Sequence, residues 1–417
     1  MKRPPIAASL LALCVACSGS ASTGADASRS LDAGILLDGG SDGSPADAGV
    51  PPTDAGDGRY ACDPSVGLVA PLPVCSVGDP CTRLIVGAGT TPITTASEVP
   101  TCTASAARGG FTDGAPRTFT DADGNTRYAC AYLPPAASAS AQVPLVVFWH
   151  GAGGHADDAY EGTSLRLHAQ SYDLSGDAAR PGFALVSIQG RNLHWPTLDP
   201  RDGPHHDQFH RDLAAPSTNR DVALADTIID ELVADGRIDA SRVYVMGWSN
   251  GGFFAQLYAI ARHEVPTPGG NRVAAASVFT AADPFQSPRF ADAGRCDLAP
   301  VPATTVPIRI VSRACDIIAC DQAQLDDLVA NDMYVAPPGV VVESWVMRLS
   351  TELGDPTTEW EIVAGTGATT ASCTSPALCG LGIAGLNHIR WPDGVGDGSG
   401  TDHEPAMLDF LRAHPLP

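Results

Sequence analysis

The segment 243–252, Val-Tyr-Val-Met-Gly-Trp-Ser-Asn-Gly-Gly, most constrains what this chain can fold into. Its apolar start predicts a strand, and residues 253–259 have the apolar spacing of an amphipathic helix. Between them lies the pattern Gly-x-Ser-x-Gly. A serine hydroxyl is a poor nucleophile unless it is exposed, rigidly held and next to a base. A sharp strand-to-helix turn would lift Ser249 above the sheet, and Gly247 and Gly251 would permit close backbone approach. We therefore interpret Ser249 as a candidate nucleophile; the alternative is a Ser/Gly turn that caps a helix.

Strands alternate with helices through the rest of the chain from residue 117, which indicates a mostly parallel sheet covered by helices on both faces. A hairpin is predicted around 121–125, and continuous apolar runs indicate strands buried on both faces. Amphipathic spacing predicts a helix over 221–236, in which Asp221 has the place of an N-cap or first-turn acid. The predicted strands are 118–120, 127–132, 144–149, 183–188, 243–246, 274–280, 306–311 and 360–363, and the last predicted helix is 404–413.

Two candidate partners of Ser249 follow later strands, where a parallel sheet gathers functional residues at the carboxyl ends. Asp316 follows the strand 306–311, and His388 follows the strand 360–363. The order Ser, Asp, His is that of α/β-hydrolases. His388 would take the proton of Ser249, and Asp316 would orient the imidazole and stabilise its charged form. Asp321 and Asp283 are the rival acids.

Four pieces of the chain have the pattern of a known family. They are the apolar strand into His-Gly-Ala-Gly-Gly at 150–154, Asn-Arg-Asp-Val-Ala at 219–223 followed by Ile-Asp-Ala-Ser-Arg-Val-Tyr-Val at 238–245, Gly-Trp-Ser-Asn-Gly-Gly at 247–252, and His388 followed closely by Trp-Pro at 391–392. With these pieces, the chain from about residue 127 to the C-terminus resembles the polyhydroxybutyrate depolymerase and feruloyl esterase group of secreted α/β-hydrolases. In place of the family's usual His-Gly-Thr-x-Asp, the acid strand here ends Ser-Arg-Ala-Cys-Asp, at 312–316.

The resemblance implies an α/β-hydrolase fold and an oxyanion hole made by the backbone N–H groups of Ala152 and Asn250. It also implies that His150 is structural, holding its loop rather than acting as a second base. Trp195 and Trp391, with Trp149, are candidates to line the substrate pocket; core packing is the alternative, since aromatic residues are usually buried.

The loop 205–210 carries three histidines and an aspartate, which are ligand types for zinc or copper. Their spacing matches no metal motif. The loop therefore remains a substrate-contacting rim or a plain polar loop, and we expect neither a metal nor a cofactor.

The first 17 residues have the features of an export signal. Two basic residues precede an apolar run over 6–16, which is too short to span a bilayer. Small residues before Cys17 resemble a bacterial lipobox, so we predict that Cys17 is lipidated. An ordinary secretory signal is the alternative. The expected location is the outer membrane or cell surface, otherwise the periplasm or the medium, with membrane contact only through the lipid.

Composition divides the remainder of the chain into three parts. Residues 18–58 are rich in Asp, Ala and Gly and indicate a disordered linker, because there is little apolar surface to bury. Residues 59–116 form a Cys-rich extension predicted to pack on the catalytic domain, 117–417. Ten cysteines remain when Cys14 and Cys17 are set aside, and they indicate disulfides in an oxidising compartment. Pairs 315–320 and 373–379 are close enough in sequence to form small loops.

The net charge of −22 argues against a nucleic-acid partner, which would require a basic surface. The leading hypothesis is a secreted serine esterase that forms an acyl-enzyme on Ser249. The alternatives are a polymer-degrading polyhydroxybutyrate depolymerase, a serine peptidase of the same fold and, last, a non-catalytic surface protein. Because no substrate-binding module follows the last helix, we expect small or oligomeric esters, namely aryl, acetylated or feruloylated sugar esters and short hydroxyalkanoate oligomers, rather than crystalline polyester.

Overall fold

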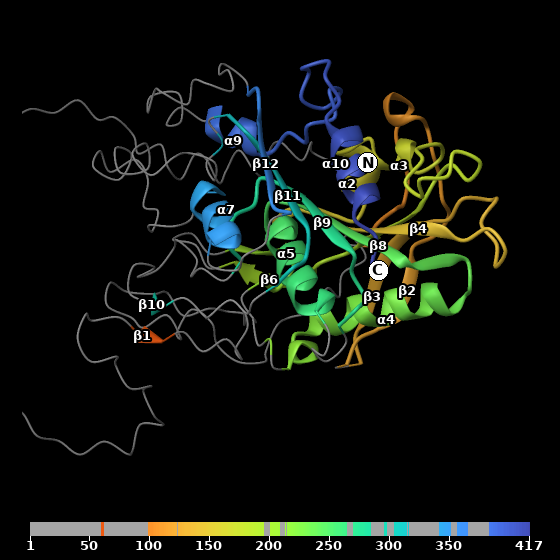
Figure 1. Cartoon of the computed structure of the whole chain (residues 1–417), viewed down its shortest axis with the longest axis horizontal. Coiled ribbons are helices and arrows are strands. Elements are labelled where there is room, and N and C mark those ends of the chain that lie inside the picture. Colours follow the sequence, from red (N-terminus) through yellow and green to blue (C-terminus); the bar gives the residue numbers. More distant parts are fainter. Residues whose placement is uncertain are drawn as a thin grey trace, which may run out of the picture.

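A central sheet of eight strands, in the spatial order β12-β11-β9-β8-β4-β5-β3-β2, organises the chain (Figure 1). Neighbours from β5 through β4, β8, β9 and β11 to β12 pair in parallel, while β3 pairs antiparallel with both β5 and β2. The sequence-based expectation of a mostly parallel sheet is therefore confirmed. The strands of this sheet are β2 (Arg117–Thr120), β3 (Thr126–Tyr132), β4 (Val143–Trp149), β5 (Ala184–Ile188), β8 (Ile238–Trp248), β9 (Ala275–Phe279), β11 (Ile308–Arg313) and β12 (Glu359–Val363).

The computed structural model describes part of the chain: residues 60–61, 99–122, 124–195, 201–208, 213, 215–264, 270–284, 296–297, 304–314, 316, 342–351, 357–365 and 383–417. The predicted signal and linker, 1–58, and the predicted cysteine pairs 315–320 and 373–379 lie outside these residues. Among the described helices, none has the length and apolar character needed to cross a membrane.

Helices cover both faces of the sheet (Figure 1). One buried cluster joins the sheet to α4, α5 and α7, and a second joins it to α2, α3 and α10. Strand β4 shows the alternation: Leu145 and Val147 belong to the first cluster, whereas Val146 and Phe148 belong to the second. The helices are α2 (Asp158–Glu161), α3 (Leu165–His168), α4 (Arg220–Ala234), α5 (Asn250–His263), α7 (Val342–Thr351), α9 (Ile383–His388) and α10 (Glu404–Ala413), with short 3₁₀ turns at Ala106–Arg108 and Pro216–Thr218.

Helix α4 begins one residue earlier than predicted, and of the two places predicted for Asp221 it takes that of the first-turn acid. Asn219 is the N-cap, and its side-chain oxygen accepts the N–H groups of Asp221 at 2.9 Å and Val222 at 3.3 Å. Asp221 is therefore not the cap; its carboxylate is buried and ion-paired beneath the sheet edge.

A hairpin of β6 (Arg191–Trp195) and β7 (Arg201–His205) was not predicted from the sequence. Its residues are mostly polar and lack the alternation of a half-buried strand, so no periodic signal marked it. A further two-residue pair joins β1 (Tyr60–Ala61) to β10 (Cys296–Asp297).

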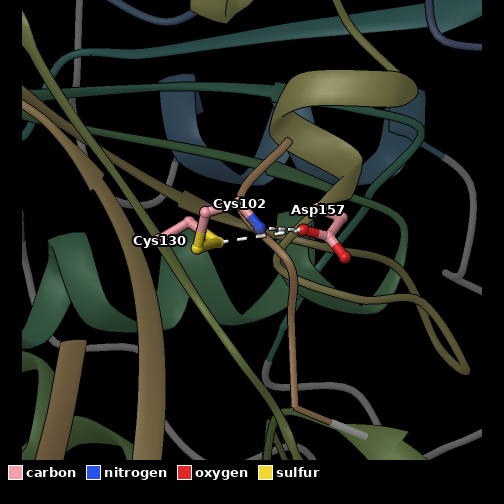
Figure 2. Close-up of side chains that lie close together, drawn as sticks. All are labelled: Cys102, Cys130 and Asp157. Carbon is pink, nitrogen blue, oxygen red and sulfur yellow. Dashed lines mark hydrogen bonds between the residues drawn. A yellow bond between two sulfur atoms is a disulfide. The ribbon is translucent and has the colours of Figure 1, made fainter. Parts of the chain in front are cut away.

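Residues 99–116 pack against the central sheet. A disulfide joins Cys102 to Cys130 of β3, and the Asp157 carboxylate beside it accepts the backbone N–H of Cys102 at 2.6 Å (Figure 2). The same carboxylate accepts the backbone N–H of Thr101 at 2.9 Å. Farther along the segment, Asp113 forms an ion pair with Arg166. The described end of the Cys-rich extension is thus cross-linked and ion-paired to the domain, through a cysteine pair that the sequence did not single out.

Candidate active site

The turn between β8 and α5 holds Ser249 in a conformation that few residues adopt. Its φ is 54° and its ψ is −120°, and its backbone N–H donates to the carbonyl of Phe279 on β9 at 3.0 Å. A positive φ at a non-glycine residue is uncommon and persists where the surrounding structure enforces it. The turn therefore presents the Ser249 side chain at the carboxyl edge of the sheet.

The two glycines of the motif are required by close backbone contacts. A Cβ on Gly247 would overlap the carbonyl of Gly251, and a Cβ on Gly251 would overlap the carbonyl of Trp149 at the end of β4. Gly151, on the loop after β4, approaches Ser249 so closely that an added Cβ would stand 3.5 Å from the serine Cβ. Any side chain at 247 or 251 would force the turn away from the sheet.

The three residues proposed from chain order come together at this edge. The hydroxyl of Ser249 lies 2.7 Å from Nε2 of His388, and Nδ1 of His388 lies 3.0 Å from a carboxylate oxygen of Asp316. Asp316 is completely buried and His388 nearly so. The carboxylate that faces Nδ1 of His388 is thus that of Asp316, the first of the three acids considered, while Asp321 lies outside the described residues.

The end of α9, which carries His388, and the residues that follow it, together called the histidine loop, are tied to neighbouring elements. The indole N–H of Trp248 donates to the His388 carbonyl at 2.9 Å, and the Asn387 amide donates to the Ala314 carbonyl at 2.8 Å. Arg313, the last residue of β11, donates to the Arg390 carbonyl and pairs with the buried Asp397, both at 2.8 Å. These contacts fix the histidine loop against the strand that supplies Asp316.

The backbone N–H groups of Ala152 and Asn250, expected to form an oxyanion hole, lie on two elements that meet at Ser249. Ala152 is on the loop after β4, and Asn250 is the first residue of α5. Within the described part of the chain, neither N–H donates a hydrogen bond to a protein acceptor.

His150 has the structural role that the family resemblance implied. Its Nε2 accepts the N–H of Gly190 at 2.9 Å, which leaves the proton on Nδ1 to donate to the Gly151 carbonyl at 2.7 Å. Burial lowers the pKa of His150 to about 3. The ring is therefore neutral at ordinary pH and holds the loop of Ala152 in place.

The two tryptophans proposed for the substrate pocket have different outcomes. Trp391 is only 1% exposed; its ring packs edge-on against Phe148 and Phe279, and its indole N–H donates to Glu404 at 2.5 Å. It is thus part of the buried core cluster that includes Phe148 and Phe279, as the alternative reading of this residue expected. The backbone of Trp195 ends β6, and its side chain lies outside the described residues. Trp149 is also fully buried.

The histidine-rich segment is described over 205–208 and is buried. The ring of His206 lies between His150 and Phe254, at centroid distances of 4.5 Å and 5.6 Å. Burial lowers the pKa of His206 well below its usual range. This segment is part of neither of the two described clusters with metal-ligand side chains. Those clusters are the disulfide-bonded Cys102 and Cys130 with Asp157, and His168 with Asp402 and Glu404, which pair α3 with the start of α10.

A buried ionic cluster beneath the site was missed by sequence reasoning. Asp221 is paired with Arg127 at 2.9 Å and Arg191 at 3.1 Å, and Arg191 also reaches Asp207 at 3.5 Å. Burial alone would raise the pKa of Asp221, but Arg191 and Arg127 hold it below its usual range. The sequence signal for this cluster was Asp221 itself, which directly follows Asn-Arg in the 219–223 motif. We interpreted Asp221 only as the acid at the start of a helix.

Asp158, the first residue of α2, provides a pH-dependent prediction. Burial raises its pKa to about 7 from 3.8, so the folded state holds the proton more tightly than the unfolded chain. Stability from this group is therefore present at acid pH and is lost as the pH rises from about 4 through 7. The isosteric Asp158→Asn variant has no such loss, and its free energy of unfolding should gain roughly 4 kcal/mol on wild type over that range. Urea unfolding at pH 4.5 and pH 8 measures this; a pH-independent difference between the two proteins would contradict it.

The strand order, the two helical layers and the site at the carboxyl edge define an α/β-hydrolase fold. The family model described as esterase PHB depolymerase matches residues 127–288. Over this segment the chain is similar to esterases of the polyhydroxybutyrate depolymerase and feruloyl esterase group, as its motifs indicated.

Individual proteins are similar to parts of this chain. The inferred esterase NocK of Nocardia uniformis subsp. tsuyamanensis is 31% identical over 142 residues, covering 34% of this chain and 35% of NocK. Feruloyl esterase B of Neurospora crassa is 30% identical over 123 residues, covering 29% of this chain and 35% of that enzyme. The matched part of the chain thus spans about a third of the length of these relatives. Among solved structures, the acetyl xylan esterase from Paenibacillus sp. R4 has a TM-score of 0.37 at 14% identity, over 72% of this chain and 83% of that chain.

Proposed function

We propose that this protein is a serine esterase that hydrolyses carboxylic esters through an acyl-enzyme on Ser249. The observation that carries the proposal is the continuous hydrogen-bonded series from Ser249 through His388 to Asp316, at 2.7 Å and 3.0 Å. Nucleophilic catalysis requires a serine within hydrogen-bond reach of a base that a third group orients. The esterase names of the family and of the relatives support the same chemistry.

The reaction has two steps. In the first, His388 accepts the hydroxyl proton as Ser249 attacks the ester carbonyl, and it then returns that proton to the departing alcohol. In the second, His388 activates a water molecule, which releases the acid and restores the serine. Asp316 keeps the imidazole in the required tautomer and stabilises its charged form. The N–H groups of Ala152 and Asn250 bind the oxygen that becomes negative in each tetrahedral intermediate.

A fluorophosphonate probe tests the mechanism directly, because it forms a covalent adduct with an activated serine. We expect the folded wild-type protein to be labelled and Ser249→Ala to remain unlabelled. A folded wild-type protein that takes up no probe would refute the enzyme proposal.

For the substrate, we propose aryl esters, acetylated or feruloylated sugar esters and short hydroxyalkanoate oligomers. The family match and the feruloyl esterase relative support this class. Initial rates on para-nitrophenyl butyrate, methyl ferulate, a peptide amide and a polyhydroxybutyrate film separate it from its rivals. Rapid clearing of the film with negligible turnover of the small esters would favour the depolymerase instead, and amide cleavage alone would favour the peptidase.

We propose further that the protein is exported and anchored by a lipid on Cys17. The apolar run before Cys17 and the disulfide between Cys102 and Cys130 both support export, since disulfides persist in oxidising compartments. Metabolic labelling with a palmitate analogue should mark the wild-type protein and not Cys17→Ser. Equal labelling of the two would refute the lipid assignment.

A further inference from the structure

The two backbone donors of the proposed oxyanion hole lie on different elements, the loop after β4 and the start of α5, and a single segment, 204–208, is hydrogen-bonded to both elements. On one side, the N–H of Gly153, next to Ala152, donates to the Pro204 carbonyl at 2.8 Å. On the other side, the segment contacts the side chain of Asn250. We call residues 204–208 the bridging segment.

The Asn250 side chain is fully engaged with this segment. Its Oδ1 accepts the backbone N–H of His206 at 2.8 Å, and its Nδ2 donates to the His206 carbonyl at 3.0 Å and to Oε1 of Gln208 at 2.8 Å. Asn250 is 2% exposed, so water does not compete for these bonds. Three hydrogen bonds therefore hold this short side chain in one orientation.

The bridging segment is in turn held from below by the buried ionic cluster. The backbone N–H of Asp207 donates to the Asp221 carboxylate at 2.8 Å, and the Asp207 carbonyl accepts the Asn219 amide at 2.7 Å. The ring of His206 rests against that of His150, which anchors the loop of Ala152. The bridging segment is therefore held in place, and both elements that carry the donors contact it.

We propose that the Asn250 side chain is a positioning residue: through the bridging segment it sets the place of the Asn250 N–H relative to that of Ala152. This inference rests on the proposed esterase function and adds a role to a residue whose backbone alone was expected to matter. Donors stabilise an oxyanion only when they are aimed in advance at the place where its charge develops. If the Asn250 N–H were displaced while both N–H groups remained present, the rate of the chemical step would fall more than the affinity for substrate would.

The experiment compares Asn250→Ala with Gln256→Ala. Alanine retains the N–H at 250 and favours a helix, so only the contacts to the bridging segment are lost. Gln256 lies on the same helix, is fully buried and bonds to Ala282 at 3.0 Å and Trp345 at 2.6 Å, away from the bridging segment. It is therefore a matched control for the loss of buried hydrogen bonds. The readouts are kcat and KM on para-nitrophenyl butyrate, the inhibition constant of phenylboronic acid, and Tm.

We expect Asn250→Ala to lower kcat by about 10- to 100-fold, below the loss of about 10²–10³ for removing a donor, with little change in KM. Phenylboronic acid forms a tetrahedral adduct that places an oxygen in the oxyanion hole. The inhibition constant of phenylboronic acid should therefore rise by a similar factor in Asn250→Ala. Gln256→Ala should lower Tm but retain kcat and boronate affinity. Should Asn250→Ala fail to fold, Gln208→Ala, which removes a single bond to Asn250, should show a smaller loss of the same kind.

Three results would overturn the proposal. The first is wild-type kcat and boronate affinity in Asn250→Ala, or in Gln208→Ala where that variant replaces it. The second is a fall in kcat with unchanged boronate affinity. The third is an equal loss of boronate affinity in Gln256→Ala. Failure of the esterase proposal itself is distinguishable, because the wild-type protein would then neither hydrolyse the ester nor react with a fluorophosphonate.

Discussion

Replacing Ser249 by alanine is expected to lower kcat/KM for a chromogenic ester by about 10⁴- to 10⁶-fold, and His388→Ala is expected to come close to that loss. Without the hydroxyl no acyl-enzyme forms, and without the imidazole 2.7 Å away the hydroxyl keeps its proton. Because the two residues act as one unit, the double variant should be little slower than either single variant. Initial rates and active-site titration of the three variants measure this.

A matched control is available for the histidine. His414 lies at the C-terminal end of α10, where Nδ1 bonds to the Phe410 carbonyl at 2.8 Å, and His414→Ala should retain the wild-type rate. If the losses of Ser249→Ala and His388→Ala multiplied fully in the double variant, His388 would not be the base that serves Ser249.

The second large effect is expected at the acid. Asp316→Asn should lower kcat by about 10⁴-fold while the fold is retained, because an amide is isosteric with the carboxyl group. The neutral amide neither stabilises the imidazolium nor holds the proton on Nδ1, so Nε2 no longer faces Ser249 as an acceptor. The Asp316 carboxylate, buried and 3.0 Å from Nδ1, is placed for both tasks. Steady-state kinetics with a check of the melting temperature measure the loss.

The rival acid provides the contrast. Asp283→Asn should retain most of the rate, because the carboxylate 3.0 Å from Nδ1 of His388 is that of Asp316. A loss at Asp283→Asn that equals or exceeds the loss at Asp316→Asn would show that the acid has been assigned to the wrong residue.

The catalytic candidates were predictable because chain order and sheet topology restrict where functional side chains meet. Ser249 follows a strand and precedes a helix, and both β11 and β12 end at the same edge of the sheet as β8. Parallel strands align their carboxyl ends, so Asp316 and His388 had to approach this edge once the strands were recognised. The helix 404–413 was predicted with the bounds that α10 shows, because its apolar spacing is regular.

The features that were missed depend on contacts that local patterns do not encode. Trp391 lies in an irregular loop, where no periodicity indicates whether a side chain faces the core or a pocket, and it faces the core. The partners Cys102 and Cys130 are 28 residues apart, and sequence does not specify disulfide connectivity. The bridging segment begins at the end of the polar strand β7. It is buried next to the ion pairs of Asp221 with Arg127 and Arg191, which no local sequence pattern indicates.

The packing of residues 99–116 determines where the protein can be shortened. Arg108 of this segment donates to the Glu161 carbonyl at 3.0 Å and pairs with Asp393, which is completely buried in the loop that follows His388. A protein that starts at Arg117 would lose the cation that pairs with Asp393 and would convert Cys130 to a free thiol. Truncation for expression or crystallisation should therefore fall before residue 99, so that the histidine loop keeps its support from the opposite end of the chain.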